Sequence, residues 1–463
     1  MSENKKMSGA KALVILLASA ACILLGALVI KSPTIVNLIA AGAVASGLGM
    51  IWGVKWDTIQ AEIIEFGKKM FPAILILMAV GMLVGAWIIC GTVPMLINIG
   101  LKILSPKFFL VVACLACSIM SVVTGTSWGT VGTLGIAFMG IAQGLGVPET
   151  YTAGAVLVGA LFGDKLSPMS DTTVLAPALS GVEVVDHIKY MLWTTGPSYI
   201  ISLIFFLVVG LKFGDGNINS ADYTAILDTL ASTFNFNVVL LVPPIVVLLL
   251  IFFKKPILPS FMVGTILGII LAMVFQNATL VQALTALNKG FTTATDVAIV
   301  DKMLMRGGIS SMLSSVGIVI AAATFGAPLK ACGVIDAVVE KIMVVAKGQK
   351  STLLCSYAFH ALLILIIGGY YTTFSIAGPM LQPLYDKYGL DKANLSRCLE
   401  DTGTSFSPLV PWCSNGVYFT STLGVAWSAY AFTTPFCYLC VIFALIYILT
   451  GFKIKQAAPV EAK

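Results

Sequence analysis

The stretch GDKLSPMSDTT, residues 163–173, decides the fold of this chain. It places two carboxylates, a lysine and four hydroxyls between the apolar runs 153–162 and 174–179. A charge at membrane depth is costly and usually functional. Pro168 lacks a backbone donor and disfavours helical geometry at Ser167, so a helix should break here. Broken helices with free backbone groups beside charged side chains are how membrane transporters build ion sites.

The composition is that of a polytopic membrane protein. Of the 463 residues, 58% are hydrophobic and 10% are charged, with a mean hydropathy of +0.99. Soluble domains carry about 25% charged residues, so the lipid bilayer is the expected surroundings. Segment 12–30 follows three lysines but is too long for the apolar core of a signal peptide, and we interpret it as the first span.

Other function classes are disfavoured by what the sequence contains. The lysines are scattered over short loops, so no nucleic-acid partner is expected. No G-x-x-x-x-G-K-[ST] run is present, which leaves ATP-driven transport without its usual motif. The 10 cysteines lie in apolar segments, and we interpret them as core residues rather than redox or metal pairs. The prediction is a transporter that is not an enzyme and has no cofactor.

Lysine clusters predict the cytoplasmic loops, because positive charge stays inside. These clusters lie at 5–11, 55–69, 254–255, 330–350 and 453–455. The spans then fall near 12–30, 33–53, 70–90, 189–211, 236–253, 256–276, 309–329 and 427–452. Segments 108–142 and 351–385 must each return to the face that they left. Either two short spans or one re-entrant hairpin satisfies this requirement.

The second half of the chain repeats the first half in order. GDKLSP at 163–168 matches GTSFSP at 403–408, and Cys90-Gly91 matches Cys332-Gly333 at nearly the same offset. The loop charges predict that the two matched segments run in opposite directions, which is an inverted repeat. The predicted fold class is an all-α polytopic membrane protein with two inverted-topology repeats and broken helices. Its predicted parts are N-terminal spans with an inner loop (1–69), a first transport repeat (70–211), linking loops and spans (212–308), a second, inverted repeat (309–452) and a cytoplasmic tail (453–463).

The central run, with TGTSWGT at 124–130 and EDTGTSFSPLVPW at 400–412, resembles the NhaC family of Na+/H+ antiporters. The resemblance covers roughly residues 70–450 in motif order. It implies a secondary antiporter with two inverted repeats and re-entrant hairpins, and it is compatible with a homodimer in the plasma membrane. The family also contains members that resemble malate–lactate exchangers and amino-acid carriers, so the resemblance does not fix the substrate.

Asp164 and Asp171 are the predicted Na+ ligands and sites of proton exchange. Sodium is a hard ion that prefers oxygen, and Ser167 and Thr172 could complete the ligand set. Lys165 could carry the exchanged proton or pair with an aspartate. The alternative is that Lys165 neutralises one of the two aspartates and the three charges only hold the helix break together.

The second repeat has lost its acid at the matched position, because Thr404 stands where the first repeat has Asp164. We expect Ser407, Asn415 and nearby carbonyls to supply neutral ligands there. Asp401 lies further from its break, so Asp401→Asn is predicted to reduce transport less than Asp164→Asn or Asp171→Asn does.

Hydroxyls crowd both hairpin candidates. Thr126 and Ser127 lie at the first predicted tip, and Thr372 and Thr373 lie at the second. They could line the substrate path, or they could make hydrogen bonds between packed helices.

Three further polar residues are given structural interpretations. Glu400, like Asp401, is expected near the membrane interface, solvated or paired. His360 is predicted to be a core residue and His187 to lie in an inner loop. Two histidines in the whole chain do not suffice for a histidine proton relay.

The leading hypothesis is exchange of Na+ for H+ at one carboxylate site that faces alternate sides. The second hypothesis is exchange of an organic acid or amino acid coupled to Na+ or H+, with Lys165 or helix N-termini binding the substrate carboxylate. A channel is disfavoured, because two broken helices that meet at mid-membrane suit an occluded site.

Overall fold

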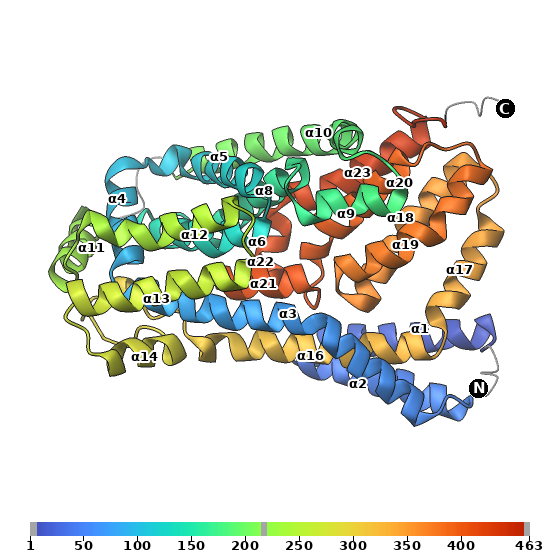
Figure 1. Ribbon diagram of the computed structural model, residues 1–463, viewed down its shortest axis with the longest axis horizontal. Coiled ribbons are helices and arrows are strands. Elements are labelled where there is room, and N and C mark those ends of the chain that lie inside the picture. Colours follow the sequence, from blue (N-terminus) through green and yellow to red (C-terminus); the bar gives the residue numbers. More distant parts are fainter. Residues whose placement is uncertain (1–6, 214–219, 458–463) are drawn as a thin grey trace.

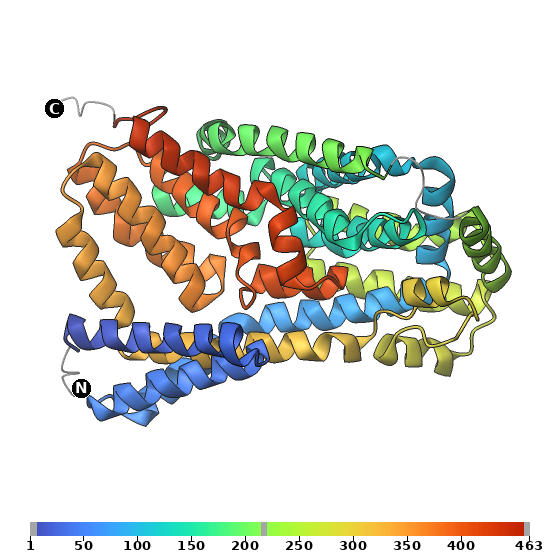
Figure 2. The same ribbon diagram turned by 180° about the vertical axis from the view of Figure 1, so that it is seen from behind.

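The computed structural model describes residues 7–213 and 220–457. Within these residues all regular elements are helices, apart from one isolated β-bridge between Leu390 and Gln456. Most helices follow one long axis (Figure 1). The start of α1 (Gly9–Leu24) and the end of α23 (Pro435–Thr450) lie at the same end of that axis, which the reverse view also shows (Figure 2). The all-α prediction is confirmed.

Eight helices of the described residues are long and apolar enough to cross a membrane. They are α1, α2 (Thr34–Ile51), α3 (Trp56–Ile89), α5 (Pro106–Thr124), α10 (Val184–Leu211), α13 (Ile257–Phe275), α16 (Ile309–Ala331) and α18 (Gln349–Ile367). Two bent pairs are further candidates: α11 (Ser220–Thr233) with α12 (Val242–Phe252), and α22 (Trp427–Tyr430) with α23. The chain is a multi-pass membrane protein.

Two predicted spans differ in detail from the structure. The span expected near 70–90 is the second half of the 34-residue helix α3, so Lys68 and Lys69 lie on a helix and not in a loop. The span expected at 427–452 is bent by 55° just before Pro435. Pro435 has no N–H with which to continue the preceding helix.

Two successive parts of the chain have the same element order. Each begins with a long helix, α3 or α16, and these two helices pack against each other. A short helix follows, α4 (Thr92–Ile103) or α17 (Val334–Val345), and then a helical hairpin, a broken helix and a final helix, α10 or α23. The two hairpins enter from opposite ends of the long axis, one beside α4 and one beside α17 (Figure 1). The repeats are therefore inverted.

A helix pair precedes each repeat. The turn of α1–α2 at Lys31 and the turn of α12–α13 at Lys254 are both left-handed, with φ of 55° and 57°. A proline follows each turn as the N-cap residue of α2 or α13. α2 packs on α16 and α13 packs on α3, so each pair contacts the long helix of the other repeat. Helices α14 (Leu280–Lys289) and α15 (Ala298–Leu304) then lead to α16.

Segments 108–142 and 351–385 are both helical hairpins, and each returns to the end of the molecule at which it began, as the loop charges require. α5 ends at Gly125, and α6 (Ser127–Thr130) with α7 (Ile136–Gly144) leads back to α4, beside which α5 began. α18 ends at Gly368, and α19 (Tyr370–Lys387) returns to bring Tyr388 within a hydrogen bond of Ala346.

Each hairpin tip docks on one broken helix. The first break separates α8 (Glu149–Leu166) from α9 (Asp171–Ser180), and a Cβ added to Gly125 would lie 2.7 Å from the backbone carbon of Met169. The second break lies between α20 (Ala393–Glu400), which continues as a π-helical turn to 405, and α21 (Ser414–Leu423). There the amide of Ser414 donates to the carbonyl of Gly368 at 2.8 Å. Both predicted breaks are present.

Candidate functional site

The first helix break is built by its own sequence. Pro168 cannot extend α8, and the Ser170 side chain caps α9 by accepting the amide of Thr173. The Thr173 hydroxyl donates to the carbonyl of Asp164 at 2.9 Å, which satisfies one of the open carbonyls at the end of α8. The break thereby holds the Asp164 side chain at the end of a helix.

Asp164 lies where the first hairpin tip meets this break. Its carboxylate is buried and accepts two hydroxyl hydrogen bonds, from Ser127 at 2.7 Å and from Ser170 at 2.6 Å. Ser127 belongs to the hairpin tip and Ser170 to the break, so two elements position one acid. Both donors are neutral, and no cation of the described residues forms an ion pair with Asp164. The negative charge of this carboxylate is uncompensated.

A cavity of about 570 Å³ opens beside Asp164. Asp171 is exposed on its wall and accepts the Tyr371 hydroxyl at 2.9 Å, which links the first broken helix to the second hairpin. Thr126, Ser127, Thr172 and Thr372 are the predicted site hydroxyls that also line this cavity. The cavity therefore brings together both aspartates and residues from both hairpin tips.

Lysines also line this cavity. Lys69 of α3 and Lys254 and Lys255 of the α12–α13 turn contribute to its lining. None of the three forms an ion pair within the part of the chain that the structure describes. Their approach to the aspartates depends on tertiary packing, and the sequence shows these lysines only as loop charges.

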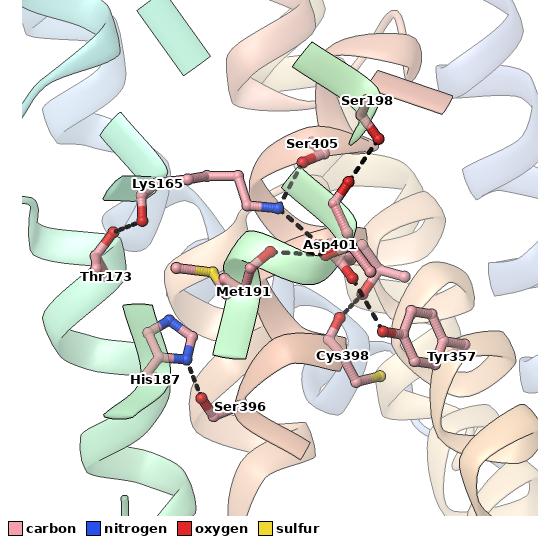
Figure 3. A network of polar contacts seen from close by, with 12 residues as sticks. Lys165, Thr173, His187, Met191, Ser198, Tyr357, Ser396, Cys398, Asp401 and Ser405 are labelled. Atoms are coloured by element: carbon pink, nitrogen blue, oxygen red, sulfur yellow. Dashed lines mark hydrogen bonds and ion pairs between the residues drawn. The ribbon is translucent and has the colours of Figure 1, made fainter. Parts of the chain in front are cut away.

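Lys165 pairs with neither aspartate of its own segment. Its ammonium lies 2.7 Å from Asp401 and 3.0 Å from the Ser405 hydroxyl, both in the second repeat (Figure 3). The side chains of Lys165 and Asp401 are fully buried. This pair replaces the expected pairing of Lys165 with Asp164 or Asp171. It also means that Asp401 is paired in the interior rather than placed near the interface.

Asp401 is further held by neutral groups. Thr194 of α10 donates to it at 3.1 Å, and Tyr357 of α18 donates at 3.1 Å. Figure 3 shows Lys165 and Tyr357 reaching this carboxylate from two elements, with the Ser405 hydroxyl on the Lys165 ammonium. The positive charge of Lys165 is therefore already matched, and Asp164 remains without a counter-ion.

Several predicted site residues make contacts that hold the framework together. The Ser167 hydroxyl donates to the carbonyl of Val122 at 2.7 Å and joins the break to α5. Thr126 caps α6 by accepting the amide of Gly129. Thr373 contacts His360 at 3.0 Å, and His360 is buried as predicted.

The second-repeat residues Ser407 and Asn415 do not line the cavity. Asn415 donates to the Ser407 hydroxyl at 2.8 Å and accepts the indole N–H of Trp128 at 2.7 Å. Trp128 stacks on Tyr418 with ring centroids 4.2 Å apart. These contacts fasten the first hairpin to the second broken helix.

Three polar residues lie elsewhere than the sequence suggested. His187 lies buried on α10 and contacts the Ser396 hydroxyl, not in a loop (Figure 3). Glu400 is fully buried, whereas an interfacial position was expected. Thr404, at the position matching Asp164, is also buried, and its hydroxyl has no hydrogen-bond partner among the described residues.

Comparison with known proteins agrees with this geometry. A profile of the Na+/H+ antiporter family matches residues 2–175 and 159–452. The chain belongs to the Na+/H+ antiporter family. This membership makes it a transporter, and Na+ and H+ are the ions that the family name gives.

Relatives within and around the Na+/H+ antiporter family differ in their named substrates. The chain is 35% identical to the Na+/H+ antiporter NhaC of Alkalihalophilus pseudofirmus, over 91% of each chain. It is 39% identical to the malate-2H+/Na+-lactate antiporter of Bacillus subtilis, over 88% of this chain and 87% of the relative. It is 31% identical to the arginine/ornithine antiporter ArcD of Halobacterium salinarum, over 89% and 85%.

Proposed function

We propose that this chain exchanges Na+ for H+ across the plasma membrane and that the carboxylate of Asp164 binds either cation. One observation carries the proposal: Asp164 is buried at the junction of a hairpin tip and a broken helix, beside a cavity, with hydroxyl partners and no counter-ion. A buried carboxylate without a counter-ion is stabilised by a proton or by a bound cation. The two ions therefore compete for one position.

Asp164 and Asp171 are the proposed sodium ligands. Both contribute oxygen to the wall of one cavity, as a hard cation requires. Asp171 is exposed and would attract the ion, while Asp164 would bind it after dehydration. Lys165 is not assigned the exchanged proton, because its charge is matched by Asp401.

Alternating access would move this site between the two faces. The cavity is lined by Lys69, Lys254 and Lys255, and lysine-rich loops face the cytoplasm. We therefore assign this conformation to the inward-facing state. The hairpin formed by α5 to α7 enters from the other end of the molecule, beside α4, and would form the outward path.

The test is exchange by purified protein in liposomes that hold a pH gradient and a pH-sensitive dye, without organic solute. Sodium should collapse the gradient, potassium should do much less, and Asp164→Asn should behave like protein-free liposomes. If sodium has no effect until an organic acid or amino acid is supplied, plain Na+/H+ exchange is wrong.

A second candidate function is coupled exchange of an organic carboxylate. The cavity of about 570 Å³ is far larger than a sodium ion needs, and its three lysines have no acidic partner in the described chain. One relative is named for malate and lactate and another for arginine and ornithine. Labelled malate, lactate and arginine should enter Na+-loaded liposomes if this candidate is right, and Lys254→Ala should reduce uptake of the acids.

A further inference from the structure

A second cavity, of about 440 Å³, lies apart from the exchange site and shares no lining residue with it. It is enclosed by α3, α4, α7, α16, α21 and the segment before α16. Six side-chain hydroxyls line it, and they belong to Ser311, Ser314, Ser315, Thr420, Ser421 and Thr422. Arg306 is the one charged residue of the lining within the described chain. A cavity of hydroxyls without a carboxylate suits a cation in passage, because a conducting site must also release its ion.

The two cavities follow each other along the same two helices. On α3 the exchange-site cavity extends to Ile76 and the second cavity begins at Val84, about 12 Å further along the helix. On α21 the corresponding residues are Ser414 and Thr420, about 9 Å apart. Tyr418 lies in this interval and stacks on the tip of the first hairpin. About two helical turns of packed side chains therefore separate the second cavity from the exchange site.

The second cavity lies on the outer side of the exchange site. α3 runs from Lys68 and Lys69 toward Val84, and lysines mark the cytoplasmic side. α16 begins beside the cavity with Ser311 and ends at the lysine-rich segment 330–350. Both helices place the cavity at the end of the molecule from which the first hairpin enters (Figure 1).

An ion pair lies at the rim of this cavity. Arg306 donates to the Glu149 carboxylate at 3.3 Å, and the two side chains are 28% and 23% exposed. This partial burial screens the pair less than a fully exposed one. Lys302 also reaches Glu149, at 3.6 Å, but it is 73% exposed and adds little.

The Glu149–Arg306 pair joins two separate groups of helices. Glu149 begins α8, and the other end of α8 carries Asp164. α8 packs on α5 and α10, whereas α16, which follows Arg306, packs on α3 and α2. The two groups form different layers in both views (Figures 1 and 2). The pair thereby fastens the helix of the proposed ion ligand to the opposite layer, and only at the outer end.

We propose that the second cavity is the outer half of the sodium path and that the Glu149–Arg306 pair latches it shut in this conformation. The inference rests on the proposed exchange at Asp164. In the outward-facing state the pair would separate and α8 would move against α16, as one group of helices rocks against the other. Hydrated sodium would then reach Asp164 through the hydroxyl-lined cavity.

The first experiment places a charge in the cavity. Right-side-out and everted membrane vesicles, from a host without Na+/H+ exchange of its own, expose the outer and the inner side of the protein. Ser314 is exposed and lines the cavity. Ser314→Lys should raise the half-saturating sodium concentration about threefold or more on the outer side, by charge repulsion. On the inner side that concentration should stay at the wild-type value.

Two variants control for size and for general surface charge. Ser314→Gln adds volume without charge and should resemble the wild type. Ser232→Lys adds the same charge to an exposed serine of α11 that lies outside the cavity, and it should also resemble the wild type. A constant ionic strength of about 0.1 M screens charges that are more than about 10 Å away.

The second experiment opens the latch. Glu149→Gln should lower the half-saturating sodium concentration on the outer side, because the outward-facing state becomes more populated. Removal of a negative charge would by itself weaken sodium binding, so the direction of the change separates a latch from simple attraction. The control is Lys330→Gln, which breaks the 2.7 Å pair with Glu62 between α16 and α3 of one layer. It should alter sodium dependence on neither side.

The outcomes separate this inference from the proposed function. Unchanged outer sodium dependence in Ser314→Lys, or an equal change in Ser232→Lys, would show that the cavity is not on the sodium path. An unchanged or raised outer half-saturating concentration in Glu149→Gln would show that the pair does not latch the cavity. If sodium moves no protons in the wild type in either vesicle orientation, the proposed function itself is wrong.

Discussion

The two broken helices of this protein share a sequence pattern but differ in what surrounds the break. At the first break, Asp164 faces a cavity and is held only by neutral hydroxyls. At the second, Ser407 and Asn415 are buried in contacts with each other and with Trp128. In our proposal one repeat presents the ion site, and the other supplies packing and the counter-charge Asp401. Inverted repeats can therefore take different roles while they share one backbone fold.

The largest expected difference between the breaks is at the matched positions 164 and 404. Asp164→Asn should abolish exchange, because an amide can neither release a proton nor balance the charge of sodium. Thr404→Val should leave exchange near the wild-type rate, because the Thr404 hydroxyl has no hydrogen-bond partner to lose. Dye-based exchange in liposomes measures both. Equal losses in the two variants would mean that the repeats are not specialised.

The next effect concerns the ion pair that joins the repeats. Lys165→Met leaves Asp401 buried and unpaired, and Asp401→Asn leaves Lys165 unpaired, so each should cost about 3–5 kcal/mol of stability. The double variant Lys165→Met/Asp401→Asn should recover much of that loss. Thermal unfolding in detergent measures the coupling. If the two single losses simply add, the pair does not act as a unit.

This expectation revises the ranking that the sequence suggests. Asp401 lies off the matched position, so the sequence alone predicts that Asp401→Asn harms transport less than Asp164→Asn does. Its bond to the fully buried Lys165 instead predicts a large loss of stability.

The hairpin tips should differ in their tolerance of a side chain. Gly125 and Gly368 both have left-handed backbones, where alanine costs about 1–2 kcal/mol. A Cβ at Gly125 would also lie 2.7 Å from the Met169 backbone, whereas at Gly368 the nearest atom is 3.3 Å away. Gly125→Ala should therefore reduce transport more than Gly368→Ala does.

A matched control for the tips is Gly67→Ala within α3. No atom lies within 4 Å of the added Cβ, so this change should be neutral or slightly stabilising. If Gly125→Ala transports as well as Gly67→Ala, the first tip does not need its close approach to the break.

The smallest effect is expected at the packed second break. Trp128→Phe keeps a ring on Tyr418 but removes the indole donor to Asn415, at a cost of about 1 kcal/mol. Thermal stability should fall slightly while exchange persists. Complete loss of exchange would show that this contact belongs to the transport path.

Local chemistry made part of the fold predictable. Pro168 stops one helix and Ser170 starts the next, and neighbouring residues alone determine both events. The match between 163–168 and 403–408 located the second break in the same way. The loop charges required both hairpin segments to return, and they do. The extension of α3 over 56–69 could not be predicted in this way, because lysines are typical of cytoplasmic loops and carry no signal of a helix there.

Contacts between the repeats could not be predicted from the sequence. Lys165 and Asp401 are 236 residues apart, and Asp171 and Tyr371 are 200 residues apart. These pairings depend on how the repeats dock, which no local pattern encodes. The same holds for Glu400, whose burial results from packing against five elements. Acids and hydroxyls in the sequence identify candidate site residues, but only the packing of the two repeats decides which of them line one cavity.

The central claim is that sodium and a proton compete for Asp164. The most direct measurement is proton release when sodium is added to the purified protein in weakly buffered detergent solution with a pH indicator. The wild type should release protons as sodium binds, acid should weaken sodium binding by reciprocity, and Asp164→Asn should release none. Sodium binding without proton release in the wild type, or unchanged release from Asp164→Asn, would contradict the account.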